Sequence, residues 1–291
     1  MNTDIYRFTV GKFDCAIVND GFYTYHEPAG ILFENAPRSA IGIALKAHGT
    51  DLDSWTEWVS AYPSLVINTG THLVLVDTGM GPRVPTTGEL HNNLRSAGFA
   101  LEDFDVVVLT HVHPDHVGGN TDSGGRSAFP NARYVIGRKE WDFWRNDPDL
   151  STLREQGFSD MMLDTAETYL PPIEGQVDFV ESGAEIVPGI SAVAAPGHTR
   201  GHLALSIRSE NEQLLAVADA VLHAVHFEHP DWTAAVDLDV RETVSTRREL
   251  FARAAEEKAL VFAPHFPLPS LGRVQSKEEA WAWMPAANQE G

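Results

Sequence analysis

The chain has 291 residues, of which 21 are basic and 41 acidic, giving a formal net charge of −20, and 43% are hydrophobic. Such an acidic protein repels phosphate backbones, which argues against nucleic-acid binding, while the hydrophobic content is that of an ordinary globular protein with a sizeable core. Cys15 is the single cysteine, which excludes an intramolecular disulfide and a thiolate metal site. Because no secretory signal and no long apolar run is visible, we expect a cytoplasmic protein without a transmembrane helix.

The first third of the chain predicts two hairpins and two helices. Gly11-Lys12 separates two alternating runs, and Thr69-Gly70-Thr71 separates another pair. Residues 21–61 are otherwise irregular, and their aromatic side chains favour a small satellite core over a pocket wall. We predict strands at residues 6–10, 13–18, 64–68 and 72–77, and helices at residues 40–47 and 89–97.

Residues 105–119 are the most informative stretch. Residues 106–109 form a short apolar run that predicts a buried strand, after which Pro114 and Gly118-Gly119 turn the chain sharply. Imidazole and carboxylate groups without thiolate suit Zn²⁺ and neighbouring divalent metals. A histidine-rich turn without a metal is the alternative, but such crowding has little packing value. The metal-competent side chains in this stretch are His111, His113, Asp115 and His116.

The rest of the chain continues the alternation of strands and helices. Three of the predicted strands lead directly to a metal-competent side chain, namely His198, Asp219 and His265. The helix predicted at residues 240–257 carries Arg247-Arg248 on its polar side. The other predicted elements are strands at 133–136, 178–181, 184–186, 190–194, 203–207, 214–217 and 260–263, and helices at 139–145, 159–169 and 277–283.

Three further histidines lie close together in a loop that contains Pro230: His223, His226 and His229. Their spacing crosses irregular chain, which argues against a metal site of their own. We interpret them as a pocket rim, with at most one of them polarising substrate, and His223 is the candidate.

The run His111-x-His113-x-Asp115-His116 after a strand resembles the signature of the metallo-β-lactamase superfamily. The resemblance implies an α/β fold, an αββα sandwich of two mixed β-sheets flanked by helices, and we expect one domain over residues 1–291. By the same resemblance, three histidines hold a first metal ion (His111, His113 and His198). A second ion takes Asp115, His116 and His265, and Asp219 bridges both. Asp77 resembles the aspartate of a turn beside the metal site and is expected to support a ligand.

Two divalent ions, with zinc the first choice, imply hydrolytic chemistry. A pair of cations about 3.5–4 Å apart lowers the pKa of a shared water toward about 7, so a bridging hydroxide can attack a lactone or ester carbonyl. Asp115 is then expected to orient the hydroxide and shuttle a proton to the leaving group.

The C-terminal half, from His229-Pro-Asp-Trp232 to Ala263-Pro-His-Phe266, resembles the branch that holds quorum-quenching N-acyl-homoserine lactonases and methyl-parathion-type organophosphorus hydrolases. One departure is that no tyrosine closely follows Asp219, where many lactonases have one, and His223 is the nearest polar residue. We therefore expect a lactonase or esterase acting on a neutral, partly apolar small molecule, with promiscuous phosphotriesterase activity. The alternatives are a phosphotriesterase as the main activity, an iron-dependent redox enzyme of the same fold and a metal-stabilised binding protein. Exposed aromatic insertions make a homodimer plausible.

Overall fold

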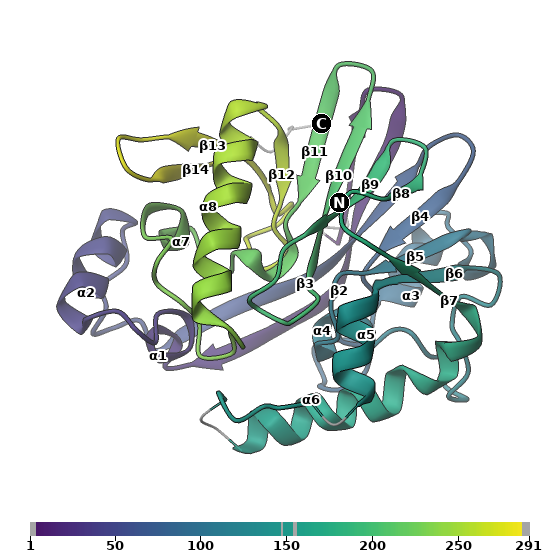
Figure 1. Ribbon diagram of the computed structural model, residues 1–291, viewed down its shortest axis with the longest axis horizontal. Coiled ribbons are helices and arrows are strands. Elements are labelled where there is room, and N and C mark those ends of the chain that lie inside the picture. Colours follow the sequence, from purple (N-terminus) through teal and green to yellow (C-terminus); the bar gives the residue numbers. More distant parts are fainter. Residues whose placement is uncertain (1–3, 147, 154–155, 287–291) are drawn as a thin grey trace.

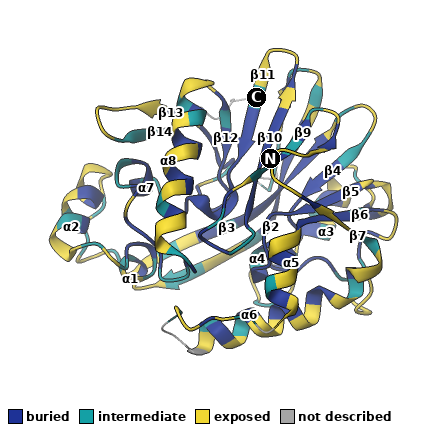
Figure 2. Cartoon of the chain, viewed as in Figure 1, coloured by how far each residue is buried: buried dark blue, intermediate teal, exposed yellow. Residues whose placement is uncertain are grey.

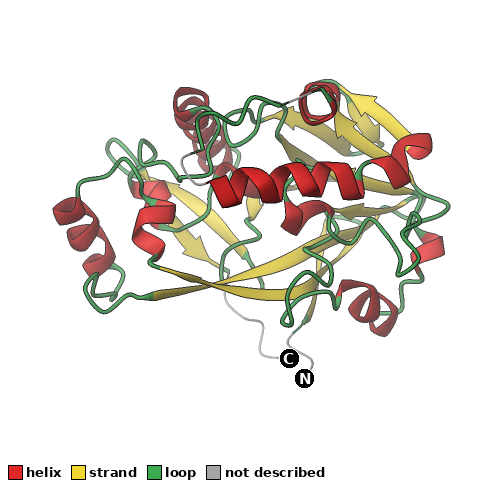
Figure 3. Ribbon diagram, turned by 90° about the horizontal axis from the view of Figure 1, so that it is seen from below, coloured by secondary structure: helices red, strands yellow, loops and turns green. Residues whose placement is uncertain are grey.

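Two seven-stranded β-sheets face each other, and helices cover the outer side of each (Figures 1 and 3). The computed structural model describes residues 4–146, 148–153 and 156–286. The αββα sandwich expected from the sequence is confirmed, and both sheets are mixed. None of the described helices combines the length and the apolar character that crossing a membrane would require.

The first sheet follows chain order from β1 to β7. Its first four strands are antiparallel neighbours, whereas β4 to β7 run parallel. Because the parallel strands share a direction, the loops at their C-terminal ends lie at one edge of the sheet. The strands are β1 Ile5–Val10, β2 Phe13–His26, β3 Glu57–Asn68, β4 Leu73–Val76, β5 Val106–Leu109, β6 Arg133–Gly137 and β7 Val177–Val180.

The second sheet has the order β14-β13-β12-β11-β10-β9-β8, and only β11 and β12 pair in parallel. This parallel pair points the chain after β11 and the chain after β12 toward the same end of the sandwich. The strands are β8 Glu185–Val187, β9 Ile190–Ala194, β10 Leu203–Ser209, β11 Glu212–Ala216, β12 Leu260–Phe262, β13 Leu271–Ser276 and β14 Trp281–Pro285.

The helices divide into three sets by the surface they cover. α3, α4, α5 and α6 pack on the first sheet, α8 packs on the second, and α1, α2 and α7 share a satellite core. Their bounds are α1 Pro28–Leu32, α2 Arg38–Ala47, α3 Leu90–Ser96, α4 Pro114–Val117, α5 Arg138–Arg145, α6 Gln156–Tyr169, α7 Val225–Glu228 and α8 Val240–Glu256.

Strand β5 shows how the apolar sequence serves two layers at once. Val106 and Val108 belong to the core between the sheets, whereas Val107 and Leu109 belong to the core under the helices. Successive side chains of a strand point to opposite faces, so a strand covered on both sides is a continuous apolar run. Figure 2 shows this burial through the middle of both sheets. The loop after β5 therefore starts from a firmly held position.

Three predictions from the sequence are wrong or incomplete. The helix predicted at residues 277–283 is wrong, because the chain forms strand β14 there. β14 pairs with β13, a strand that was not predicted from the sequence. The irregular segment at 21–61 contains the second half of β2 and the first half of β3, joined in register after a shift between Asn19 and Phe22. Arg247 is not on the polar side of α8, because its side chain is fully buried. Phe33 and Trp55 of the aromatic segment lie in the satellite core around α1, α2 and α7, as expected. Tyr23, Tyr25 and Trp58 line cavities, so the segment also supplies part of a pocket wall.

Candidate metal centre

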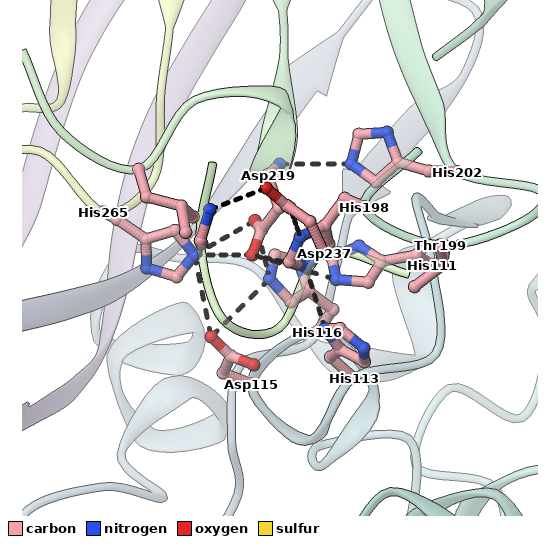
Figure 4. A network of polar contacts seen from close by, with 12 residues as sticks. His111, His113, Asp115, His116, His198, Thr199, His202, Asp219, Asp237 and His265 are labelled. Atoms are coloured by element: carbon pink, nitrogen blue, oxygen red, sulfur yellow. Dashed lines mark hydrogen bonds and ion pairs between the residues drawn. The ribbon is translucent and has the colours of Figure 1, made fainter. Parts of the chain in front are cut away.

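Four loops bring the seven expected ligand side chains to one end of the sandwich (Figure 4). The loop after β5 supplies four of them, and α4 begins right after the second, with Pro114 as its first residue. The loops after β9, β11 and β12 supply one each. Six of these side chains are buried, and Asp115 is partly exposed. The seven are His111, His113, Asp115, His116, His198, Asp219 and His265.

The side chains form two groups that share Asp219. Each group offers one ligand atom per residue, and the atoms within a group lie within 4.8 Å of one another. The first group is His111, His113, His198 and Asp219, and the second is Asp115, His116, Asp219 and His265.

The two carboxylate oxygens of Asp219 face different groups. Oδ2 lies 3.3 Å from His198 Nε2 and 3.9 Å from His111 Nε2. Oδ1 lies 3.1 Å from His116 Nε2, and His265 Nε2 lies 3.0 Å from both oxygens. Asp219 is thus placed to bridge two cations, one in each group.

Two nitrogen atoms test whether this arrangement fits a metal. The Nε2 atoms of His111 and His116 are buried and have no hydrogen-bond partner among the described residues. Leaving a buried polar atom unsatisfied costs about 1–3 kcal/mol, whereas one cation in each group would take up the lone pair of one of these nitrogens. The nitrogen and oxygen donors suit zinc and similar divalent metals, so the residues present fit two such ions.

The electrostatics favour neutral imidazoles at two positions. Burial, together with the imidazole of His116, holds the pKa of His111 well below its ordinary value. Burial and His198 do the same to the pKa of His113. Burial also lowers the pKa of His198, but its hydrogen bonds with Asp219 and Asp237 outweigh burial and raise the pKa to about 9. In Asp219, the charges of His265 and His116 outweigh burial and hold the pKa well below the ordinary range.

Each histidine of the second group is held by a partner on its outer nitrogen. His116 Nδ1 donates to Asp77 Oδ2 at 2.7 Å, and Asp77 itself accepts from the backbone N–H and hydroxyl of Thr110 at 2.8 and 2.9 Å. His265 Nδ1 shares a hydrogen bond of 2.8 Å with Ser60 Oγ, from β3. Such partners fix the tautomer and ring orientation of a metal ligand, and the geometry agrees with the supporting role expected of Asp77.

His198 and Asp219 are supported from behind. His198 Nδ1 donates to Asp237 Oδ1 at 2.8 Å, and Arg247 Nη2 lies 3.5 Å from the other oxygen of Asp237. The backbone N–H of Asp219 donates to His202 Nε2 at 3.1 Å, and His202 Nδ1 donates to a backbone carbonyl. Burial lowers the pKa of His202 to about 3, which agrees with a neutral ring.

Sequence reasoning missed Ser60, Asp237 and the inward position of Arg247. Ser60 lies in a segment that was predicted to be irregular, and Asp237 lies in a loop with no recognisable motif. For Arg247 a signal existed, because it occupies the buried stripe of α8 with Thr243, Leu250 and Ala254 at helical spacing.

His223 lies away from the ligand groups, in the satellite core. Its ring is 5.5 Å from that of Phe33 and 5.6 Å from that of Trp55, and burial lowers its pKa to about 4. His226 is fully buried and bonds to the carbonyl of Leu32 at 2.8 Å. These contacts indicate that His223 and His226 are packing residues and do not form the rim of the pocket. His223 is not among the described residues that line the two cavities near the ligand groups.

A cavity leads away from the ligand atoms. A space of about 60 Å³ lies over both groups, and a larger one of about 680 Å³ adjoins it. The larger space ends at Tyr169, Arg83 and Asp164, the last two of which form an ion pair. The two spaces share a mainly apolar wall made of Tyr25, Ile31, Met80, Phe158 and Met161.

Comparison with known proteins identifies the family. Residues 58–265 match the family described as the Metallo-beta-lactamase superfamily, and the chain belongs to this superfamily. N-acyl homoserine lactonases from a Bacillus species and from Bacillus cereus are 26% and 28% identical over 185 residues, which is 63% of this chain and 64% of each relative. The match therefore spans less than two thirds of these relatives' length.

Solved structures resemble the whole chain. AidC, a dizinc quorum-quenching lactonase in complex with a product, N-hexnoyl-L-homoserine, has a TM-score of 0.89 and 28% identity, with 97% of both chains covered. AbOPH, a hydrolase in the beta lactamase superfamily, has a TM-score of 0.88, with 99% of both chains covered. Its identity is 24%, so this second likeness shows the fold alone.

Proposed function

We propose that this protein is a metal-dependent hydrolase that uses two divalent cations, zinc in the first instance, to open a lactone ring or cleave an ester in a neutral substrate with an apolar tail. The observation that carries the proposal is the pair of ligand groups sharing Asp219 beneath an apolar cavity. The similarity to N-acyl homoserine lactonases supports an acyl lactone as the substrate class. Because loops of both sheets build the site, we further infer one domain.

The chemistry divides between the ions and the protein. When bound, two cations supply Lewis acidity and make water a nucleophile at neutral pH. His111, His113 and His198 would hold one cation, Asp115, His116 and His265 the other, and Asp219 both. Asp115 is the partly exposed member of the set and faces the cavity, so its free oxygen can take a proton from the attacking water and return it to the leaving oxygen.

The walls of the cavity suit an apolar tail. Phe158 and Met161 of α6 face Tyr25 and Ile31 across it, and Met side chains adapt to substrates of varied shape. The Tyr25 hydroxyl, bonded to that of Tyr62 at 2.9 Å, adds a polar group on the side of His265. With a net charge of −20, the protein is better matched to a neutral substrate than to a polyanion.

The first test measures turnover and metal dependence together. Protein stripped of metal by a chelator and reloaded with zinc is expected to hydrolyse N-acyl homoserine lactones and to lose that activity when the chelator is added again. Hydrolysis is measured as the release of protons. Paraoxon serves as the phosphotriester arm, and a faster rate on paraoxon would make phosphotriester cleavage the main activity. Metal analysis that finds iron, with oxygen consumption on a thiol, would instead support the redox alternative. A zinc-loaded protein that turns over neither substrate class would refute the hydrolase proposal.

Substrate length provides a second prediction. Met161→Trp is expected to fill part of the 680 Å³ space and raise the KM for a decanoyl lactone about 10- to 100-fold, because the tail loses contact for two or three methylene groups at about 0.8 kcal/mol each. The KM for a butanoyl lactone should stay near the wild-type value. Leu163→Trp, on the exposed side of the same helix, is the matched control. An equal change for both chain lengths would place the tail elsewhere.

A further inference from the structure

Glu140 is a buried carboxylate close to the ligand groups but a member of neither. It lies in the first turn of α5, its exposed fraction is 0%, and among the described residues it forms no ion pair. A buried charge without a counter-charge is costly unless hydrogen bonds compensate for lost water. The hydrogen bonds of Glu140 therefore indicate why it is there.

Four donors converge on this carboxylate. Oε1 accepts from the backbone N–H of Val112 at 3.0 Å and from the indole N–H of Trp144 at 2.7 Å. Oε2 accepts from the hydroxyl of Thr199 at 2.8 Å and from the backbone N–H of Gly201 at 2.8 Å. Burial raises the pKa of Glu140, and these hydrogen bonds oppose the rise. Since both oxygens are occupied by donors and the N-terminal turn of a helix favours negative charge, the arrangement is that of an ionised carboxylate.

Three of the four donors belong to the two loops that carry the imidazoles of the first ligand group, and the fourth, Trp144, lies in α5 with Glu140. Val112 lies between His111 and His113, while Thr199 directly follows His198 and Gly201 lies two residues further on. Glu140 thus connects the loop after β5 with the loop after β9, which come from different sheets. Without this link, each loop would leave a backbone N–H buried and unpaired.

Two more contacts show how closely these parts fit. The ring of Trp144, held by Glu140, meets that of His113 at a centroid distance of 6.0 Å. A Cβ on Gly201 would lie 2.1 Å from the backbone nitrogen of Glu140, so only glycine allows the loop to approach α5 this far. The second ligand group has supports of its own, since Asp77 bonds to His116 and Ser60 to His265. Asp77 also accepts from the Thr110 hydroxyl, which lies 3.0 Å from His111 Nδ1, so Ser60 is the support confined to the second group.

We propose that Glu140 is a positioning residue that holds His111, His113 and His198 in one arrangement, and thereby sets the affinity of the first ligand group for its metal ion without setting that of the second. The inference rests on the proposed two-ion site. Its consequence is that the two metal affinities depend on different supports, so a substitution can weaken one and spare the other.

The test measures zinc affinity one group at a time. His265→Ala disables the second group, and His198→Ala disables the first, so each background reports on the remaining ion. Glu140→Gln keeps the shape but turns an amide N–H₂ toward two donors. In the His265→Ala background it is expected to weaken zinc binding about 10- to 100-fold, the usual effect of losing an outer partner of a metal ligand. In the His198→Ala background it is expected to leave zinc affinity unchanged. Affinities are read by competition with a chromophoric chelator.

Matched variants control for charge and folding. Asp142→Asn removes an exposed carboxylate from the same helix and should change neither affinity. Ser60→Ala should give the mirror result, with weakening only in the His198→Ala background, because the Ser60 hydroxyl bonds to His265. If Glu140→Gln does not fold, Thr199→Val and Trp144→Phe each remove one donor and should weaken only the first group by a smaller factor.

Two results overturn the positioning role: equal weakening of both groups, or unchanged affinity in the His265→Ala background with a lowered melting temperature of the metal-free protein. A wild-type chain that does not take up two zinc ions would refute the two-ion function itself, and this outcome is distinguished by the same titration.

Discussion

Asp219→Asn is expected to lower kcat/KM about 10²- to 10⁴-fold, the range seen when a group acting directly on the transition state is removed. Asparagine keeps the volume of the side chain but loses the charge that lies within 3.0–3.9 Å of four imidazole nitrogens. It can also offer only one oxygen, whereas Asp219 turns one oxygen toward each ligand group. The bound zinc is therefore expected to fall from two ions per chain to one or none, which elemental analysis of the purified protein measures alongside the rate.

Asp231→Asn is the matched control, because Asp231 is an exposed carboxylate that is not part of either group. It should retain both ions and the full rate. An Asp219→Asn protein that keeps two zinc ions and more than a tenth of the activity would show that Asp219 does not bridge the ions.

The four ligand residues that lie within six positions of each other could be predicted from the sequence, because one short loop contains all of them. His111 to His116 follow a run whose apolar character fixes it as a buried strand, and the structure has this strand at Val106–Leu109, as expected. His198, Asp219 and His265 also follow strands, but only the resemblance to a known family linked them to the first loop. The structure brings them together because β9, β11 and β12, the strands that precede these residues, run in the same direction and end at the same edge of the second sheet.

What the sequence did not reveal are interactions between residues far apart in the chain. Ser60 contacts His265 because β3 continues to pair with β2 beyond the register shift between Asn19 and Phe22 of β2. That shift interrupts the alternation of inward and outward side chains by which a strand is recognised in a sequence. Trp281 and Trp283 lie two residues apart on β14, and both pack toward the core under α8. This spacing of two is typical of a strand, although a helix was predicted for the segment. In both segments, aromatic side chains hid the strand pattern.

Arg247→Met is expected to destabilise the fold by about 3–5 kcal/mol, the usual cost of removing one partner of a buried ion pair. The guanidinium is fully buried, donates to the carbonyl of Ala220 at 2.6 Å and to that of Trp232, and lies 3.5 Å from Asp237. Its loss leaves the Asp237 carboxylate buried without the guanidinium charge and with His198 as its remaining charged neighbour among the described residues. The melting temperature of the metal-free protein should fall by roughly 5–8 °C, and measuring it with chelator present separates folding from metal binding.

The neighbouring residue supplies the control. Arg248 is exposed on the same turn of α8, so Arg248→Met should change the stability by no more than about 0.5 kcal/mol. The double variant Asp237→Asn with Arg247→Met should be more stable than the sum of the single effects predicts, because removing both charges leaves neither one buried alone. That double variant should still bind zinc less tightly, since His198 then loses the carboxylate that holds its ring. If Arg247→Met melts no earlier than Arg248→Met, the buried guanidinium is not stabilising the loop that carries Asp237.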